Sequence, residues 1–211
     1  QESVDKWLFA TARAPHFVNM GRVLDRMEIP EADQAWIAGL RDRNIHNAAA
    51  AVVDYRTGEV LAYAGSAAFY AEDDLQFQSD YDVLAKGFRQ PGSAIKPINY
   101  ITGIDDGSMT AATMFMDVTT DFGGQKPFTP IQADKKERGP VRLRSALQFS
   151  LNIPSVKAGL INGLDHLLQR MKDFGLEFPD KTFPVTSMSI GTLGIHPIDL
   201  LSAYGAIGNG G

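Results

Sequence analysis

The 211-residue sequence contains no cysteine, no long apolar run and no dense block of basic residues. The absence of thiols excludes disulfides, thiolate zinc sites and a cysteine nucleophile, and it is compatible with any redox compartment. No stretch approaches the ~20 apolar residues of a membrane span, and the polar N-terminus is unlike a signal peptide. The net charge is −5, so the concentrated basic surface that non-specific nucleic-acid binding needs is missing. The four histidines lack metal-ligand spacing and no glycine-rich phosphate loop is present, so we expect neither a metal nor an organic cofactor.

What the sequence does contain is typical of a globular domain with a core. Hydrophobic residues make up 44% of the chain and charged residues 21%, which excludes the disordered, collagen-like and coiled-coil classes. The chain ends at Asn209-Gly210-Gly211, directly after an apolar helical pattern. Folded domains seldom end within turn-forming residues, so we expect the sequence to be part of a larger domain.

The clearest strand signal is a hairpin that follows a helical, linker-like region at 1–47. Residues 48–53 are small, apolar and partly β-branched, turn residues follow at 54–58, and a second apolar run covers 59–65. This pattern predicts two buried strands, which are followed by a polar, irregular surface segment at 66–90. Because a two-stranded ribbon is marginal alone, either helices cover it or further strands lie beyond residue 211, and we favour the second.

Beyond residue 90 the pattern is mainly helical. Ile95, Ile98, Ile101 and Ile104 recur at every third position and predict a buried helix that ends near residues 105–107. Residues 117–138 have few periodic apolar positions and predict a long loop. Four further helices are predicted: 139–149 with Pro140 in its first turn, one N-capped by Asn152, 164–174 stopped by Gly175, and one that Pro197 opens and that runs through Ile207.

Ser93 and Lys96 form the first candidate for a chemical site. A serine nucleophile needs a base within hydrogen-bond reach, and a spacing of three on a helix places both side chains on one face. Pro97 is tolerated only near a helix start, so the helix begins at about Gly92 or Ser93, with the Ser93 N–H free to bind an oxyanion. Lys96 can act as the base if burial lowers its pKa. The four-residue pattern alone carries little weight, since residues 3–6 match it in a polar tail.

Ser150 and Asn152 form the second candidate, in the short link between two predicted helices. A hydroxyl and an amide held two residues apart in a turn can face one cleft. By themselves, however, the two residues are more typical of one helix end and the cap of the next helix. Their weight comes from the combination with Ser93 and Lys96.

In combination, these motifs resemble the transpeptidase domain of penicillin-binding proteins, especially the bifunctional class A enzymes that build the bacterial cell wall. The matching segments keep the family's order: a joining stretch at 14–18, a first hairpin at 49–62, the nucleophile motif RQPGSAIKP at 89–97, the second motif SLNIPSV at 150–156, and a later helix and turn at 203–211. The resemblance implies an α/β (α+β) fold of the serine β-lactamase and penicillin-binding transpeptidase type, with an antiparallel sheet and a helical subdomain. This chain would hold only its first part, with about two strands. The implied division is a linker and N-terminal helix region at 1–47 and the N-terminal part of a transpeptidase domain at 48–211.

The resemblance also implies roles for the four candidate residues. Ser93 would be acylated by the D-Ala-D-Ala end of a peptidoglycan stem peptide with release of D-alanine, and Lys96 would take the serine proton. Ser150 would relay a proton to the leaving amine, while Asn152 would orient Lys96 and bind the substrate amide. An amine of a neighbouring stem would then attack the acyl-enzyme to form the cross-link, and β-lactam antibiotics would trap Ser93. The family needs no cofactor.

The family's third motif, Lys-Ser/Thr-Gly on the strand that lines the cleft, is absent. Lys181-Thr182-Phe183 is the nearest string, but it comes too early and Phe183 replaces the glycine that lets substrate approach the strand. We therefore expect the chain to lack about half of the sheet, to be inactive alone, and to be completed by the remaining part of the domain as another chain or segment. The family also implies an extracytoplasmic location, in the periplasm or on the outer face of the cytoplasmic membrane, with an anchoring segment that is absent here.

Three other functions stay open. A serine β-lactamase shares the Ser-x-x-Lys fold but needs a deacylating base, and no glutamate lies in a convincing position. A catalytically silent module on the same fold could bind or sense β-lactams or muropeptides without acylation of Ser93. A wholly structural, all-helical domain with fortuitous motifs is the most distant alternative.

Overall fold

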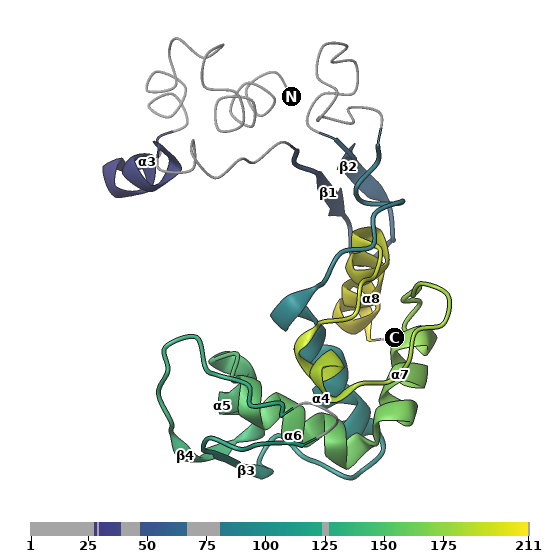
Figure 1. Ribbon diagram of the computed structural model, residues 1–211. Helices are drawn as coiled ribbons and strands as arrows, with labels where there is room; N and C mark the ends of the chain where they lie inside the picture. Colours follow the sequence, from purple (N-terminus) through teal and green to yellow (C-terminus); the bar gives the residue numbers. More distant parts are fainter. Residues whose placement is uncertain (1–27, 29, 39–46, 67–80, 124–126, 211) are drawn as a thin grey trace. The chain divides into compact units, whose positions relative to one another are not determined.

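A computed structural model describes residues 28, 30–38, 47–66, 81–123 and 127–210 (Figure 1). The elements follow one another as α3 (Glu31–Ala38), β1 (Ala50–Val53), β2 (Val60–Ala64), η3 (Gly92–Ile95), α4 (Lys96–Asp105), β3 (Met114–Asp117), β4 (Gly139–Arg142), α5 (Leu143–Gln148), α6 (Asn152–Asn162), α7 (Leu164–Asp173), η4 (Thr186–Ile190) and α8 (Pro197–Asn209). The chain divides into two compact units, Gln1–Gly87 and Phe88–Gly211. The first unit holds α3, β1 and β2, and the second holds everything from η3 onward.

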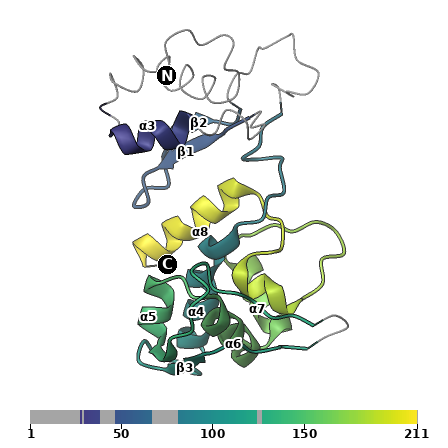
Figure 2. The same cartoon turned by 60° about the vertical axis from the view of Figure 1, so that its left-hand side comes forward.

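The predicted hairpin of the first unit is confirmed. β1 and β2 pair antiparallel, and they lie side by side in Figure 2. Gly58 closes the turn between them, because its N–H donates to Asp54 O at 2.8 Å and its φ of +75° is a left-handed conformation that glycine adopts without a Cβ clash.

The prediction that both hairpin strands are buried is wrong. Val60 and Leu61 are exposed by 52% and 61%, and neighbouring residues of a strand point to opposite faces. Both faces of the ribbon therefore carry apolar side chains that are about half exposed. The apolar pattern predicted the two strands correctly. It could not predict their burial, because burial depends on which other elements pack against the strands.

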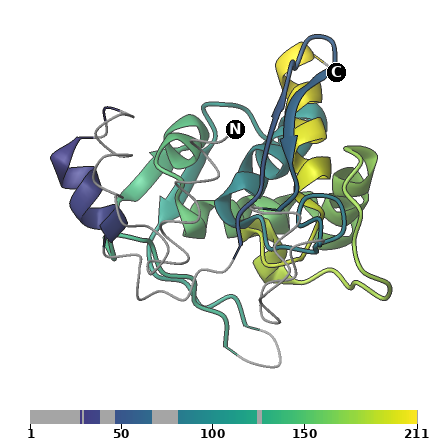
Figure 3. The same cartoon turned by 90° about the horizontal axis from the view of Figure 1, so that it is seen from above.

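The second unit is built around α4. Figures 1 and 3 show α5 on one side of α4 and α7 on the other, and α6 contacts α4, α5, α7 and η4. One buried cluster gathers side chains from η3, α4, α7, η4 and α8: Ile95, Ile98, Leu167, Leu168, Met171, Leu176, Met188, Ile195 and Ala203. A second buried cluster lies toward α5 and β3: Tyr100, Met109, Phe115, Leu143, Ala146, Leu151 and Ala158. The isoleucine stripe is thus buried at Ile95 and Ile98, whereas Ile104 is 44% exposed near the helix end.

β3 and β4 form a second two-stranded antiparallel sheet that the sequence did not predict. The expected helix from residue 139 is wrong in its first turn, because residues 139–142 form β4 and α5 begins only at Leu143. Pro140 lies opposite Met116 in this sheet. Proline is tolerated here because each strand of a two-stranded sheet is an edge strand and needs no donor on its outer side. Between the two strands, the described residues form neither helix nor strand, as expected for the predicted loop.

The remaining helices agree with the sequence except at one cap. α7 ends before Gly175, and α8 begins at Pro197, as predicted. Asn152, however, is the first residue of α6 and not its N-cap, which is Leu151. Among the described residues, no helix is long and apolar enough to cross a membrane.

Candidate active site

Ser93 lies in the 3-10 turn η3, immediately before α4. The predicted helix start near Gly92 or Ser93 is confirmed for the 3-10 turn, which begins at Gly92, whereas the α-helix α4 begins at Lys96 with Pro97 in its first turn. The Ser93 side chain is exposed. Neither its hydroxyl nor its backbone N–H makes a hydrogen bond to another described residue, so both groups are available to a ligand.

The segment around Ser93 is held by the segment 191–204. Three contacts hold it: Gly92 N–H donates to Gly191 O at 3.1 Å, Arg89 and Ile195 exchange two backbone hydrogen bonds of 2.8 and 3.0 Å, and the Tyr204 hydroxyl donates to Ala94 O at 2.8 Å. The backbones approach most closely at Gly191. A Cβ on Gly191 would lie 2.0 Å from Gly92 O, and its φ of +81° also favours glycine. The segment around Ser93 is therefore positioned by a segment about 100 residues later in the sequence.

Lys96 is the buried cation of this region. Its side chain is 1% exposed, and Nζ donates to Ser150 O at 2.6 Å, to Asn152 Oδ1 at 2.7 Å and to Ser150 Oγ at 3.2 Å. Burial disfavours the charged ammonium and lowers the pKa of Lys96 to about 8. A lysine with this pKa is a base whose neutral form is populated near neutral pH.

The carbonyl and the hydroxyl of Ser150 both accept hydrogen bonds from Lys96, and the Ser150 backbone is strained. Its φ is +53°, a left-handed conformation that is costly for a residue with a Cβ. This conformation accompanies the approach of both the carbonyl and the hydroxyl of Ser150 to the Lys96 amine. Strain of this kind persists only where the surrounding structure imposes it.

Asn152 links Lys96 to the loop between β3 and β4. While Oδ1 accepts from Lys96, Nδ2 donates to Ile131 O at 2.7 Å and the backbone N–H donates to Gln132 Oε1 at 2.7 Å. The Gln132 amide in turn donates to Asp117 at the end of β3. Asn152 is already the first residue of α6, and its side chain bonds to Lys96 and to Ile131 O instead of to a backbone N–H of the helix, so the predicted N-cap is wrong.

The structure thus joins three of the four predicted site residues by hydrogen bonds: Lys96, Ser150 and Asn152. Ser93 lies three residues before Lys96, and no hydrogen bond links the two side chains. The sequence did not identify four residues that hold the site. Gly191 and Tyr204 support the Ser93 turn, while Gln132 and Asp117 support Asn152. Gly191, Gln132 and Asp117 lie outside the matched motifs, and Tyr204 lies in the matched segment 203–211 without a role of its own there, so only their spatial neighbours reveal what they hold.

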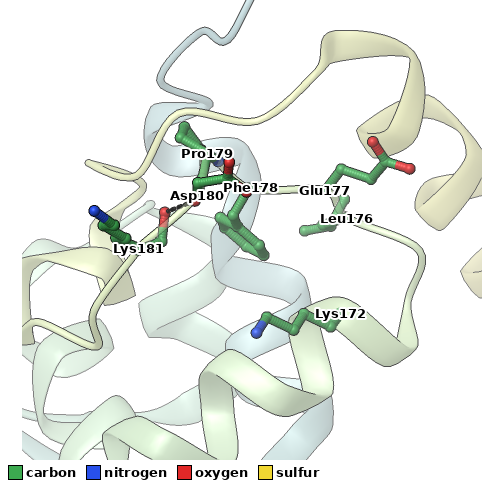
Figure 4. Close-up of a pocket in the computed structure, with 8 residues that line it drawn as sticks. Lys172, Leu176, Glu177, Phe178, Pro179, Asp180 and Lys181 are labelled. Atoms are coloured by element: carbon green, nitrogen blue, oxygen red, sulfur yellow. Dashed lines mark hydrogen bonds between the residues drawn. The ribbon is translucent and has the colours of Figure 1, made fainter.

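The nearest string to a third motif does not form a strand. Lys181 and Thr182 lie in an irregular segment in which the Thr182 hydroxyl donates to Pro179 O at 2.7 Å. A surface cavity of about 460 Å³ lies between this segment and Lys172 of α7. Figure 4 shows Lys181 and Glu177 pointing away from each other at its rim. No candidate site residue lines this cavity.

No metal site is apparent in the part of the chain that the structure describes. There, no three His, Asp or Glu side chains come together in a way that could hold an ion.

Comparison with known proteins identifies the family. The model of the penicillin-binding protein transpeptidase domain matches residues 48–211. Penicillin-binding protein 1A of Neisseria lactamica is 32% identical over 164 residues, which cover 75% of this chain and 19% of that protein. Penicillin-binding protein 2D of Bacillus subtilis is 32% identical over 163 residues, which cover 75% of this chain and 22% of that protein. The chain belongs to the penicillin-binding protein transpeptidase family, which confirms the resemblance inferred from its motifs.

Solved structures agree on the fold. The crystal structure of penicillin-binding protein 1A from Haemophilus influenzae matches with a TM-score of 0.67 and 25% identity, over 76% of this chain and 23% of that one. PBP2 of Pseudomonas aeruginosa, solved in complex with WCK 5153, matches with a TM-score of 0.67 and 20% identity, over 79% of this chain and 47% of that one. The predicted fold class is thereby confirmed. The chain spans about a fifth of the length of the curated relatives named above.

Proposed function

We propose that the chain is part of a peptidoglycan D,D-transpeptidase that acts through a Ser93 acyl-enzyme and is inhibited covalently by β-lactams. The observation that supports this most strongly is the buried Lys96, whose amine is held by Ser150 and Asn152 one turn after an exposed serine. Nucleophile, base and polar partners of the base thus come from two motifs that are far apart in the sequence.

In the first step, Ser93 Oγ attacks the carbonyl carbon of the penultimate D-alanine of a stem peptide. The hydroxyl proton passes to the neutral amine of Lys96, whose lowered pKa makes this transfer possible near neutral pH. The Ser93 N–H, which has no acceptor among the described residues, can donate to the developing oxyanion.

In the second step, the tetrahedral intermediate releases D-alanine. The Ser150 hydroxyl lies 3.2 Å from Lys96 Nζ and can pass a proton from that amine to the leaving nitrogen. Asn152 keeps Lys96 in place through Oδ1, and its Nδ2 has a second N–H for the substrate amide beside the one that is donated to Ile131 O. The amine of a neighbouring stem then attacks the ester carbonyl and gives up a proton to the neutral Lys96 amine. As the amide cross-link forms and the ester C–O bond breaks, this proton passes to Ser93 Oγ and restores the hydroxyl.

We further propose that the remaining part of the domain completes the sheet, as another chain or segment, and supplies the third motif. The hairpin β1–β2 supports this, because a two-stranded sheet is marginal by itself and Val60 and Leu61 are more than half exposed on its two faces. The whole protein would then act outside the cytoplasm, in the periplasm or on the outer face of the membrane, where peptidoglycan is cross-linked. We assign residues 48–211 to the transpeptidase domain and residues 1–47 to the region that precedes it.

The proposal is tested with the full-length protein, a synthetic stem pentapeptide ending in D-Ala-D-Ala, and an acceptor amine. We expect D-alanine release and a new amide product from the unaltered protein and neither from Ser93→Ala. Ser202→Ala, on the exposed side of α8, is the matched control and should behave like the unaltered protein. Penicillin bound without a covalent adduct would favour the silent sensor, and rapid turnover of penicillin would favour the β-lactamase.

A further inference from the structure

Gln132 uses both ends of its side-chain amide, although it lies in a loop without helix or strand. Its side chain is 6% exposed, Nε2 donates to Asp117 Oδ1, and Oε1 accepts the Asn152 N–H at 2.7 Å. A backbone N–H can only donate, so the Asn152 N–H fixes Oε1 on its side and leaves Nε2 facing Asp117.

Gln132 satisfies one backbone donor at the N-terminus of α6. The Asn152 N–H belongs to the first turn of α6, where backbone donors have no partner within the helix. Gln132 Oε1 accepts this N–H at the same residue whose side-chain Oδ1 accepts from Lys96, so Gln132 holds the backbone from which the Lys96 partner extends. The adjacent Ile131 accepts from Asn152 Nδ2 at 2.7 Å, so two consecutive loop residues hold both the backbone and the side chain of Asn152.

The buried side chain of Asp117 holds Gln132 in place. Its side chain is fully buried, and Oδ2 has no hydrogen-bond partner among the described residues, although Arg138 lies 3.8 Å away. A buried carboxylate with so few partners is expensive to keep. Its one side-chain hydrogen bond is the one that orients Gln132.

We propose that Gln132, anchored by Asp117, is a positioning residue that holds Asn152 and, through it, Lys96 in the geometry needed for acylation. The proposal rests on the proposed function, in which Lys96 is the base for Ser93. It assigns a role to the loop between β3 and β4, which the family motifs leave without one.

The test measures the acylation rate constant of the full-length protein with a fluorescent penicillin as a function of pH. In Gln132→Ala we expect a loss of about tenfold, the size of one lost hydrogen bond to a buried donor. The pH at which the rate constant reaches half its maximum should also fall. This pH follows the pKa of Lys96, and a poorly held Asn152 no longer favours the charged form of Lys96. Gln169→Ala, which removes an exposed hydrogen bond to Asp173 on α7, is the matched control and should leave both quantities unchanged.

A second pair of variants separates positioning from loss of fold. Gln132→Glu places two carboxylates against each other and should slow acylation by at least tenfold. In the double variant Asp117→Asn with Gln132→Glu, the new amide at 117 donates to the new carboxylate at 132. The second oxygen of that carboxylate remains available to the Asn152 N–H. We expect the double variant to recover to within about threefold of the unaltered protein, since the lost hydrogen bond is restored.

Three outcomes would overturn the proposal: an unchanged rate and pH profile in Gln132→Ala, an effect no larger than in Gln169→Ala, or a double variant no faster than Gln132→Glu. Hydrogen exchange at the Asn152 amide gives a readout that does not depend on acylation. If the unaltered protein is not acylated, the proposed function fails, but faster exchange of this amide in Gln132→Ala still supports the positioning of Asn152. Unchanged exchange refutes it.

Discussion

Replacing Lys96 by arginine tests the role of a buried base, because it keeps the positive charge and removes the ability to accept a proton. Burial lowers the pKa of Lys96 from 10.5 to about 8. At pH 7 a base of pKa about 8 is neutral in roughly one molecule in ten, whereas at the ordinary value it is neutral in roughly one in 3,000. Burial therefore raises the reactive fraction about 300-fold, which is equivalent to about 3 kcal/mol.

The assay is the acylation of the full-length protein by a fluorescent penicillin between about pH 6 and pH 9.5. We expect the rate constant to rise about tenfold per pH unit at low pH and to reach half its maximum at about pH 8, the pKa of Lys96. Lys96→Arg should lose at least about 100-fold of the rate, the lower bound for general-base catalysis, and should show no such rise. Lys157→Arg is the control, since Lys157 Nζ donates to Met116 O at 2.6 Å outside the candidate site.

Two results would refute the reasoning. A rate that does not change between pH 6 and pH 8 in the unaltered protein would mean that no group with the expected pKa limits acylation. A Lys96→Arg variant within tenfold of the unaltered protein would mean that the buried amine is not the base.

Three further substitutions probe how the site is held. Tyr204→Phe removes the hydrogen bond to Ala94 O and should cost about 1 kcal/mol of stability and slow acylation severalfold. Gly191→Ala places a Cβ 2.0 Å from Gly92 O at a φ of +81°, so we expect a loss of at least about 2 kcal/mol and a lower melting temperature. Ser150→Gly relieves a φ of +53°, so it should stabilise the fold by about 1 kcal/mol while acylation falls.

Each of these variants has a matched control or a contrary result. Gly205→Ala on α8 meets no atom within 4 Å, so a melting temperature as low as that of Gly191→Ala would contradict the close backbone contact. Tyr55→Phe changes an exposed tyrosine and should leave acylation unchanged. If Ser150→Gly were both less stable and fully active, the strain at Ser150 would have neither the cost nor the role assigned to it.

The parts of the fold that could be predicted are those whose signals are local. The pattern of Ile95 and Ile98, with Pro97 near the helix start, located α4 and the burial beside Lys96. Gly175 and Pro197 marked the boundaries of α7 and α8 correctly. These signals act within a single helical turn, so the sequence carries them directly.

The parts that could not be predicted depend on distant neighbours. β3 and β4 are four residues each and are separated by a long loop, so neither has enough alternating positions to be recognised. Asn152 has the chemistry of an N-cap, but it is the first residue inside α6, its side chain is engaged by Lys96, and its N–H donates to Gln132. Local capping rules therefore failed where a tertiary contact used the same atoms.

Peptide-mapped mass spectrometry of the full-length protein after incubation with penicillin measures the central claim most directly. The account predicts an added penicillin mass on the peptide that contains Ser93, located at its hydroxyl, and no such adduct in Ser93→Ala. An adduct on another residue, or bound penicillin with Ser93 unmodified, would contradict it.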